Sequence, residues 1–281
     1  MTIAASLLCG TVGVAAAVVP PAPEAFDLQP HTLAAFQRYA AATEGRVLQQ
    51  VPATGPFLYI DHLPQRERDE ILAELRAGEM YMDRLHTRTT EGEEFEIEDG
   101  LVHHWLGVVF VPGATLEETM VLIQDYDRHA QIYAPHVAAA HIIERDGQEF
   151  EVFMRFRKEK VITVVMDTVH DVHYVSPAPD RTYSISRTTS VREVEEAGTA
   201  QERVLPDGQG SGFLWRLNSY WRFQERDGGT YVECESISLT RTIPFVLRWL
   251  IGPFVNDVPR EQLAELLQTT RQTLMNAPER P

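Results

Sequence analysis

Positive charge is scarce in this chain. It carries 25 Lys and Arg residues against 41 Asp and Glu residues, which gives a formal net charge of −16. Binding along a nucleic-acid backbone needs a concentration of Lys and Arg that is missing here, and docking on an anionic lipid surface is disfavoured for the same reason. We therefore expect no nucleic-acid partner and assign the charge to solubility.

Cysteine is scarcer still, because Cys9 and Cys234 are the two in the chain. If the first 26 residues are removed, Cys234 remains alone, which excludes an intramolecular disulfide and a zinc site built from clustered cysteines. A lone cysteine within a strand is typically a small buried hydrophobic residue. We expect Cys234 to belong to the core.

Charged residues are missing from positions 3–19, and the first basic residue is Arg38. This apolar run is marginal for spanning a bilayer, and the three alanines at 15–17 suit a signal-peptidase site. Residues 1–26 are predicted to be a signal peptide or N-terminal anchor, although the basic residues usual before such a run are lacking. We expect an exported protein, periplasmic or secreted, or one held near a membrane by this segment. A leader that does not function would leave the protein cytoplasmic.

Catalytic motifs are also missing. The sequence has no Gly-rich phosphate loop before a helix, no nucleophile elbow and no His-Glu-x-x-His helix. The adjacent His103 and His104 would point to opposite faces of a strand, and His170 and His173 differ by an odd number, so neither pair can chelate one ion. We predict no metal site and no cofactor, and assign no catalytic residue.

Hydrophobic periodicity predicts two amphipathic helices, at 31–49 and 64–78, followed by a hairpin at 81–99. A strand at 101–111 leads to a helix capped by Thr115, and a short helix follows near 127–133. Asp-Gly pairs and polar turns then separate further alternating runs, which predict strands at 137–145, 148–158, 161–174, 181–195, 211–225 and 229–241. The chain closes with a helical region at 244–275, interrupted near Pro253 and Pro259.

Three stretches carry a resemblance to a known superfamily: GLVHHWLGVVFVPGATLEE, DYDRHAQIYAP and GFLWRLNSYWRFQERDGGTYVECESISL. Together with the element order, they resemble bacterial START-like proteins of the START and Bet v 1-like superfamily, which also includes polyketide cyclases. The resemblance implies an α+β helix-grip fold over 100–276, in which a curved antiparallel sheet of about seven strands wraps a long C-terminal helix. Residues 27–99 are expected to form an N-terminal helical and hairpin extension packed on this domain.

The turn at Asp227-Gly228 predicts the pairing of the last two strands, with partner numbers that sum to 455. One face then carries Trp215, Leu217, Ser219, Trp221, Ser236 and Cys234, and the other carries directly opposed charges such as Arg222 and Glu233. Opposed charges suit a solvated face, so the tryptophan-rich face is expected to point inward. Its mixture of large and small side chains favours a cavity over a filled core, which is the alternative interpretation.

The resemblance implies that such a cavity lies between the sheet and the long helix. The predicted ligand-binding residues are Trp215, Leu217, Ser219, Trp221, Ser236, Trp249, Leu250, Phe254 and Leu263. Two polar groups stay open. The run from Asp125 to His129 is interpreted as a capped helix junction, as a gate to the cavity or as the source of an acid and a base. Arg155, Asp167 and Arg187 are interpreted as a charged ladder on either face of the sheet.

The leading hypothesis is a non-catalytic protein that binds or transports a lipid or another hydrophobic small molecule in this cavity. The alternative is a polyketide cyclase-like or hydrolase-like enzyme that uses the same pocket. It requires polar residues that converge inside and a strongly perturbed pKa. A third hypothesis is an interaction module with a filled interior.

Overall fold

The computed structural model describes residues 26–159, 162–242 and 248–277, and for 248–257 the backbone alone. The helices are α1 (Pro30–Gln49), η1 (Tyr59–His62), α2 (Gln65–Arg76), α3 (Leu116–Ile123), η2 (Tyr126–Arg128), α4 (His129–Ile132) and α5 (Arg248–Met275). The strands are β1 (Tyr81–Arg84), β2 (Gly100–Pro112), β3 (Val137–Asp146), β4 (Glu149–Glu159), β5 (Thr163–Ala178), β6 (Arg181–Glu195), β7 (Arg203–Val204), β8 (Arg216–Arg226) and β9 (Gly229–Arg241). Most of the predicted leader lies outside the described residues.

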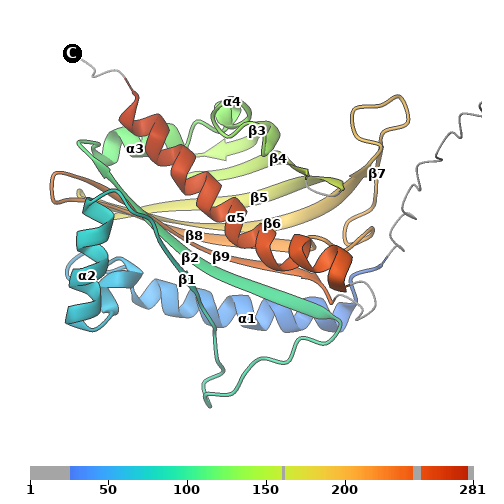
Figure 1. Ribbon diagram of the computed structural model, residues 1–281, viewed down its shortest axis with the longest axis horizontal. Coiled ribbons are helices and arrows are strands. Elements are labelled where there is room, and N and C mark those ends of the chain that lie inside the picture. The colour runs from blue at the N-terminus through green and yellow to red at the C-terminus, as the bar shows by residue number, and fades with distance from the viewer. Residues whose placement is uncertain (1–25, 160–161, 243–247, 278–281) are drawn as a thin grey trace, which may run out of the picture.

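The nine described strands form one antiparallel sheet in the order β1-β2-β9-β8-β6-β5-β4-β3, with β7 paired to β6. Consecutive strands joined by short turns must pair antiparallel, which explains most of this order. Helix α5 lies across one face of the curved sheet, and α1 runs along the other (Figure 1). The predicted helix-grip architecture is confirmed, with nine strands in the described residues where about seven were expected.

The β8–β9 hairpin has the predicted register. Asp227 and Gly228 both have positive φ, 58° and 78°, as the two central residues of a tight hairpin turn require. The pairs that follow, such as Trp221 with Cys234 and Ser219 with Ser236, sum to 455. Cys234 is free and buried, as expected.

The inner face of the sheet packs directly on α5 at Gly107. A Cβ atom at this position would overlap the Leu267 side chain and press on Met82 Sδ. The missing side chain therefore lets the backbones of β2 and α5 approach closely. Helix α5 is continuous through positions 253 and 259, so the predicted interruptions at these two prolines are wrong. No helix among the described residues is long and apolar enough to cross a membrane.

The outer face of the β8–β9 hairpin is buried, and the expectation that it is solvated is wrong. Arg222, Glu233 and Glu235 are each 0% exposed. Glu233 accepts hydrogen bonds from Arg222 and from the Tyr59 backbone N–H, while Glu235 accepts from Arg46 of α1. The N-terminal extension therefore supplies the cover and the partners of this charged face.

The extension braces the sheet on the side away from α5. The buried face of α1 presents Phe36, Tyr39 and Val47 to the sheet, and α2 with η1 covers β2 through Ile60 and Leu75. The expected hairpin at 81–99 takes a different form. Its first part, β1, is an edge strand paired with β2, and a single bridge joins Arg88 and Glu94.

Candidate functional site

A cavity lies between the inner face of the sheet and α5. The volume open to the centre of a water molecule is about 230 Å³, far above the roughly 10–15 Å³ that one water needs on this measure. Its floor comes from β4, β5, β6, β8 and β9, its roof from residues 258–269 of α5, and one side from α3, η2 and α4. The alternative of a filled interior is therefore wrong for this part of the molecule.

Most predicted residues line this cavity. Leu217, Ser219, Trp221 and Ser236 face it from β8 and β9, and Leu263 faces it from α5. Their placement follows from the register and from strand alternation. Ligand binding by them stays a prediction. The side chains of Trp249, Leu250 and Phe254 lie outside the described residues.

Trp215 does not line the cavity, and its predicted inward position is wrong. It is 3% exposed and belongs to the cluster that includes Phe36 and Tyr39 of α1, on the outer face. The ladder between β8 and β9 begins at Arg216 with Leu239. Alternation holds only within a paired strand, so counting back from Leu217 fails one residue before the strand starts.

Hydroxyl-bearing residues form much of the cavity floor. Ser186 of β6 lies opposite Ser219 of β8, which in turn lies opposite Ser236 of β9. Ser184 lies two residues before Ser186 on the same face, and its Oγ atom forms no hydrogen bond of normal geometry among the described residues. An apolar cavity with a few placed polar groups is typical of small-molecule sites.

A hydrogen-bonded chain crosses the floor between β4 and β6. Ser186 Oγ lies 3.3 Å from His170 Nδ1, His170 Nε2 lies 2.9 Å from Thr168 Oγ1, and Thr168 donates to the Met154 carbonyl at 3.0 Å. Burial lowers the pKa of His170 to about 4, so its ring is neutral at pH 7. Sequence reasoning missed these hydrogen bonds, because the contact between His170 and Ser186 joins two different strands.

Tyrosines close the end of the cavity near η2. The hydroxyls of Tyr126 and Tyr174 are 2.6 Å apart, and Tyr133 bonds to Thr270 of α5 at 3.0 Å. Burial raises the pKa of Tyr133 to about 12, and it lowers the pKa of His129 to about 4. These groups are neutral at pH 7, so they add polarity to this end of the cavity without adding charge.

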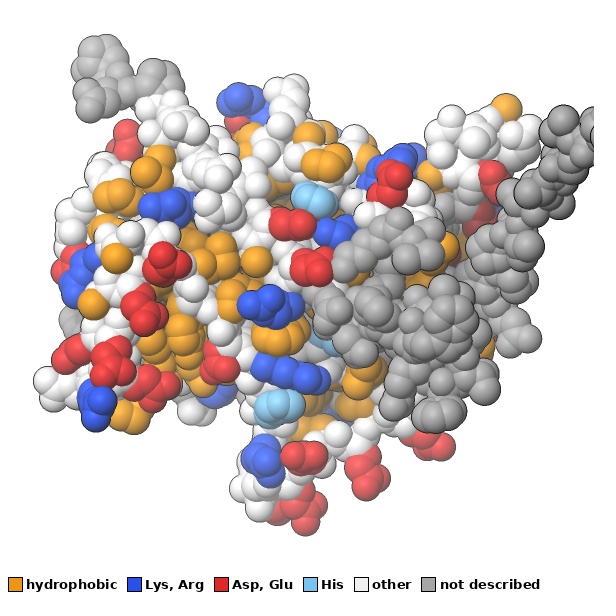
Figure 2. Space-filling view, in the orientation of Figure 1, with side chains coloured by type: hydrophobic (Ala, Val, Ile, Leu, Met, Phe, Trp, Pro, Cys, Tyr) orange, Lys and Arg blue, Asp and Glu red, His pale blue; other side chains and the backbone are white. Residues whose placement is uncertain are grey.

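An ion-paired cluster marks the edge of the cavity beside α5. Lys158 of β4 lies 2.9 Å from Glu265 of α5, and His136 lies 3.1 Å from the same carboxylate. Acidic and basic side chains also lie side by side on the molecular face that α5 crosses (Figure 2). The pairing ties β4 to α5 where the cavity meets the surface.

The two open polar groups have a structural explanation. Asp125 pairs with Arg128 at 3.3 Å, and Asp127 accepts from the Ile142 backbone N–H, which supports the interpretation as a helix junction. Arg155 and Asp167 form a two-point pair. The predicted ladder does not include Arg187, which binds Glu44 of α1 instead.

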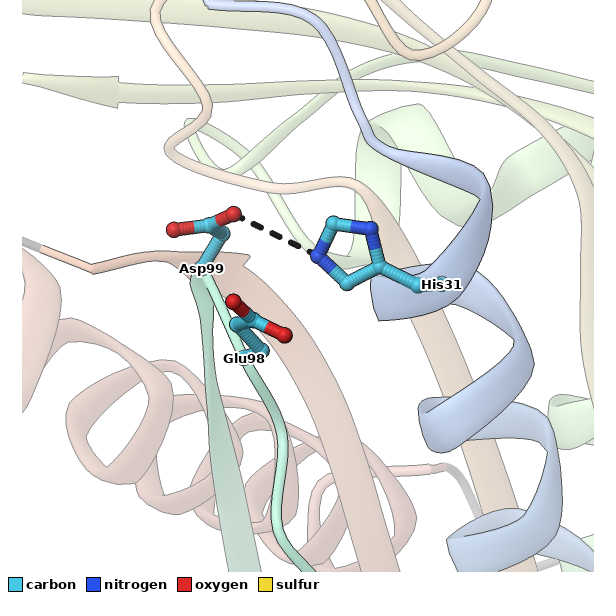
Figure 3. Close-up of side chains that lie close together, drawn as sticks. All are labelled: His31, Glu98 and Asp99. Carbon is cyan, nitrogen blue, oxygen red and sulfur yellow. Dashed lines mark ion pairs between the residues drawn. The ribbon is translucent and has the colours of Figure 1, made fainter.

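The adjacent histidines of β2, His103 and His104, point to opposite faces of the sheet. His104 bonds to Tyr39 and Glu235 on the outer face, while His103 bonds to Thr240 on the inner face. A different group lies at the start of α1, where His31, Glu98 and Asp99 point toward one another (Figure 3). All three are exposed, and His31 forms a 3.3 Å ion pair with Asp99.

Comparisons with known proteins return structures but no sequence family. No protein-family model and no curated protein matches the chain. Among solved structures it is similar to the STAR-related lipid transfer protein from Xanthomonas axonopodis, with 19% identity over 63% of this chain and 96% of that chain and a TM-score of 0.39. Human STARD10 is similar with 9% identity over 77% of this chain and 82% of that chain and a TM-score of 0.43.

The Zhui aromatase/cyclase from Streptomyces sp. R1128 is also similar, with 13% identity over 62% of this chain and 94% of that chain and a TM-score of 0.38. At these identities the likeness concerns the overall fold and assigns neither a ligand nor a reaction. The structure has the helix-grip fold that the sequence resemblance implies, a curved antiparallel sheet wrapped on a long C-terminal helix.

Proposed function

We propose that the protein binds a lipid or another hydrophobic small molecule in the cavity under α5 and releases it chemically unchanged. The cavity itself is the observation that carries this proposal. Trp221 and Leu217 line the cavity and are only half-buried. Part of their apolar surface is therefore free to contact a ligand. Covering apolar surface contributes roughly 25 cal/mol per Å².

The structures with a similar fold support the same class of ligand. One is named a lipid transfer protein and another an aromatase/cyclase, and the two names differ in whether the bound molecule is transformed. The predicted leader adds that this protein works outside the cytoplasm or beside a membrane, which we propose as its location.

The test is to extract the purified protein with organic solvent and identify bound molecules by mass spectrometry, alongside native mass spectrometry of the intact complex. Ser219→Phe fills the cavity floor and is expected to remove the bound molecule. Ser190→Phe is the matched control, because Ser190 is half-buried on β6 and does not line the cavity. Wild-type protein that is empty and takes up no added lipid would refute the proposal.

The enzyme alternative is favoured by one observation, the neutral His170 bonded to Ser186 inside the cavity. A neutral histidine beside a hydroxyl group is able to accept its proton. Incubating the co-purified molecules with fresh protein distinguishes the two functions. The carrier returns them with unchanged masses, whereas the enzyme yields a product whose formation stops in His170→Leu and continues in Ser190→Ala.

A further inference from the structure

The direction of the hydrogen bonds in the cavity floor is fixed by their last member. Thr168 Oγ1 gives its only hydrogen to the Met154 carbonyl oxygen, at 3.0 Å. It can therefore only accept at its contact with His170 Nε2, 2.9 Å away. The ring nitrogen Nε2 must carry the hydrogen, and in a neutral imidazole the other nitrogen, Nδ1, is then an acceptor.

This assignment also determines the direction of the hydrogen bond made by Ser186. Because His170 Nδ1 accepts, the Ser186 hydroxyl hydrogen points to it across 3.3 Å. A serine hydroxyl has one hydrogen and two lone pairs, so Ser186 presents lone pairs alone to the cavity. Both Ser186 and His170 are buried, at 7% and 3% exposure, so bulk water does not readily reverse the direction of these hydrogen bonds.

Ser184 offers the opposite capacity two residues earlier. It is 1% exposed and lines the cavity, and its Oγ forms no hydrogen bond of normal geometry among the described residues. The residue opposite it on β5 is Tyr174, whose hydroxyl bonds to Tyr126 at 2.6 Å and lies close enough to Ser184 for the serine to lower the pKa of Tyr174. A buried hydroxyl that is poorly bonded is costly, so the Ser184 hydrogen gains by turning from Tyr174 to a ligand oxygen.

No positive charge among the described lining residues is free to pair with a ligand. Among the described lining residues, Lys158 is the one ammonium or guanidinium group, and Glu265 already holds it at 2.9 Å. A carboxylate at the floor would meet the lone pairs of Ser186 with no free cation beside it. A buried unpaired charge is strongly disfavoured.

We propose that the cavity selects a neutral apolar molecule that carries a hydroxyl group, which donates its hydrogen to Ser186 Oγ and accepts one from Ser184. This inference rests on the proposed function and makes it narrower. A ketone or an ether accepts from Ser184 but has nothing to donate to Ser186. A carboxylate has nothing to donate either and is charged in addition.

Two matched probe series test the proposal by isothermal titration calorimetry of the full-length protein, freed of co-purified lipid, at pH 7.5. One series is decan-1-ol, 1-methoxynonane and decanoate, and the other is 2-naphthol, 2-methoxynaphthalene and 2-naphthoate. The alcohol of each series is expected to bind about three- to tenfold more tightly than its ether, the range for one net hydrogen bond. The carboxylate is expected to bind more weakly than both.

Variants test whether Ser186 and His170 cause the preference for alcohol over ether. Ser186→Ala should remove the preference for alcohol over ether, and Ser190→Ala on the same strand should keep it. His170→Leu frees the Ser186 hydrogen, so binding of the ether should improve and the preference should shrink. This second variant keeps the test decisive if Ser186→Ala folds poorly, because a purely structural role of His170 would weaken both probes equally.

The outcomes separate the two proposals. Equal binding of alcohol and ether by the wild type, or an undiminished preference in Ser186→Ala, would overturn the hydroxyl inference and leave hydrophobic binding intact. Failure of all six probes, together with an empty protein after purification, would overturn both. Tightest binding by the carboxylates would overturn the inference and indicate that Lys158 exchanges Glu265 for the ligand.

Discussion

The buried pair of Arg222 and Glu233 gives the sharpest prediction about stability. Both side chains are 0% exposed, and Arg222 donates to Glu233. The two carboxylate oxygens of Glu233 also accept from the Tyr59 backbone N–H, each at 2.9 Å. Replacing Arg222 with Met keeps the aliphatic length but leaves the Glu233 carboxylate without its cation.

The expected loss of stability depends on whether this face of the sheet is buried or exposed to solvent. Removing one partner of a buried pair costs about 3–5 kcal/mol, whereas an exposed pair contributes roughly 0–1 kcal/mol. The burial observed here predicts the larger value for Arg222→Met. The double variant Arg222→Met, Glu233→Gln should recover much of the loss, because the amide is neutral and its oxygen still accepts from Tyr59.

Urea unfolding followed by circular dichroism measures these differences, provided that the m value stays constant between variants. Arg66→Met is the control, since Arg66 and Glu70 form a 2.9 Å pair on the exposed side of α2 with 93% and 63% side-chain exposure. It should cost less than about 0.5 kcal/mol. A loss below about 1 kcal/mol in Arg222→Met would refute the burial of this face under the extension.

Three further predictions concern the cavity and the sheet. Below pH 6.5 the unfolded chain protonates His170 while the native state, with a pKa of about 4, does not, so the free energy of unfolding should fall by up to about 3 kcal/mol between pH 6.5 and 4. Denaturation of His170→Leu at matched pH values should lack this part of the slope. Ser184→Ala removes a buried hydroxyl that forms no hydrogen bond of normal geometry and should stabilise the unliganded protein by about 1 kcal/mol; a lower melting temperature would contradict this. Gly229→Ala places a Cβ atom against the Val111 carbonyl oxygen and should lower the free energy of unfolding by about 2 kcal/mol or more. Unchanged stability in urea would show that β2 and β9 can move apart at this position.

Local patterns in the sequence were sufficient for most of the elements. Asp227-Gly228 specified a tight turn, and strand alternation then placed Leu217, Ser219 and Trp221 on one face. Thr115 caps α3 through a reciprocal capping box with Glu118. These features depend on neighbouring residues along the chain, and each such signal is complete within a few positions.

The opposed charges of β8 and β9 show where local reasoning ends. Arg222 and Glu233 face each other as the register requires, but the same pattern occurs on a solvated face and under a covering segment. The cover comes from Tyr59 and Arg46, more than 170 residues away along the chain. No pattern within a strand contains that information.

The site itself divides in the same way. The sequence by itself determined that an alternating hairpin would present serine and tryptophan inward, and that a long C-terminal helix would lie over it. The tertiary structure alone decided that His170 would meet Ser186, because a register shift between β5 and β6 falls at Val169 and His170. A bulge changes which side chains are neighbours across strands, and its position depends on the packing of the whole sheet. The hydrogen-bond direction at the cavity floor follows from that contact.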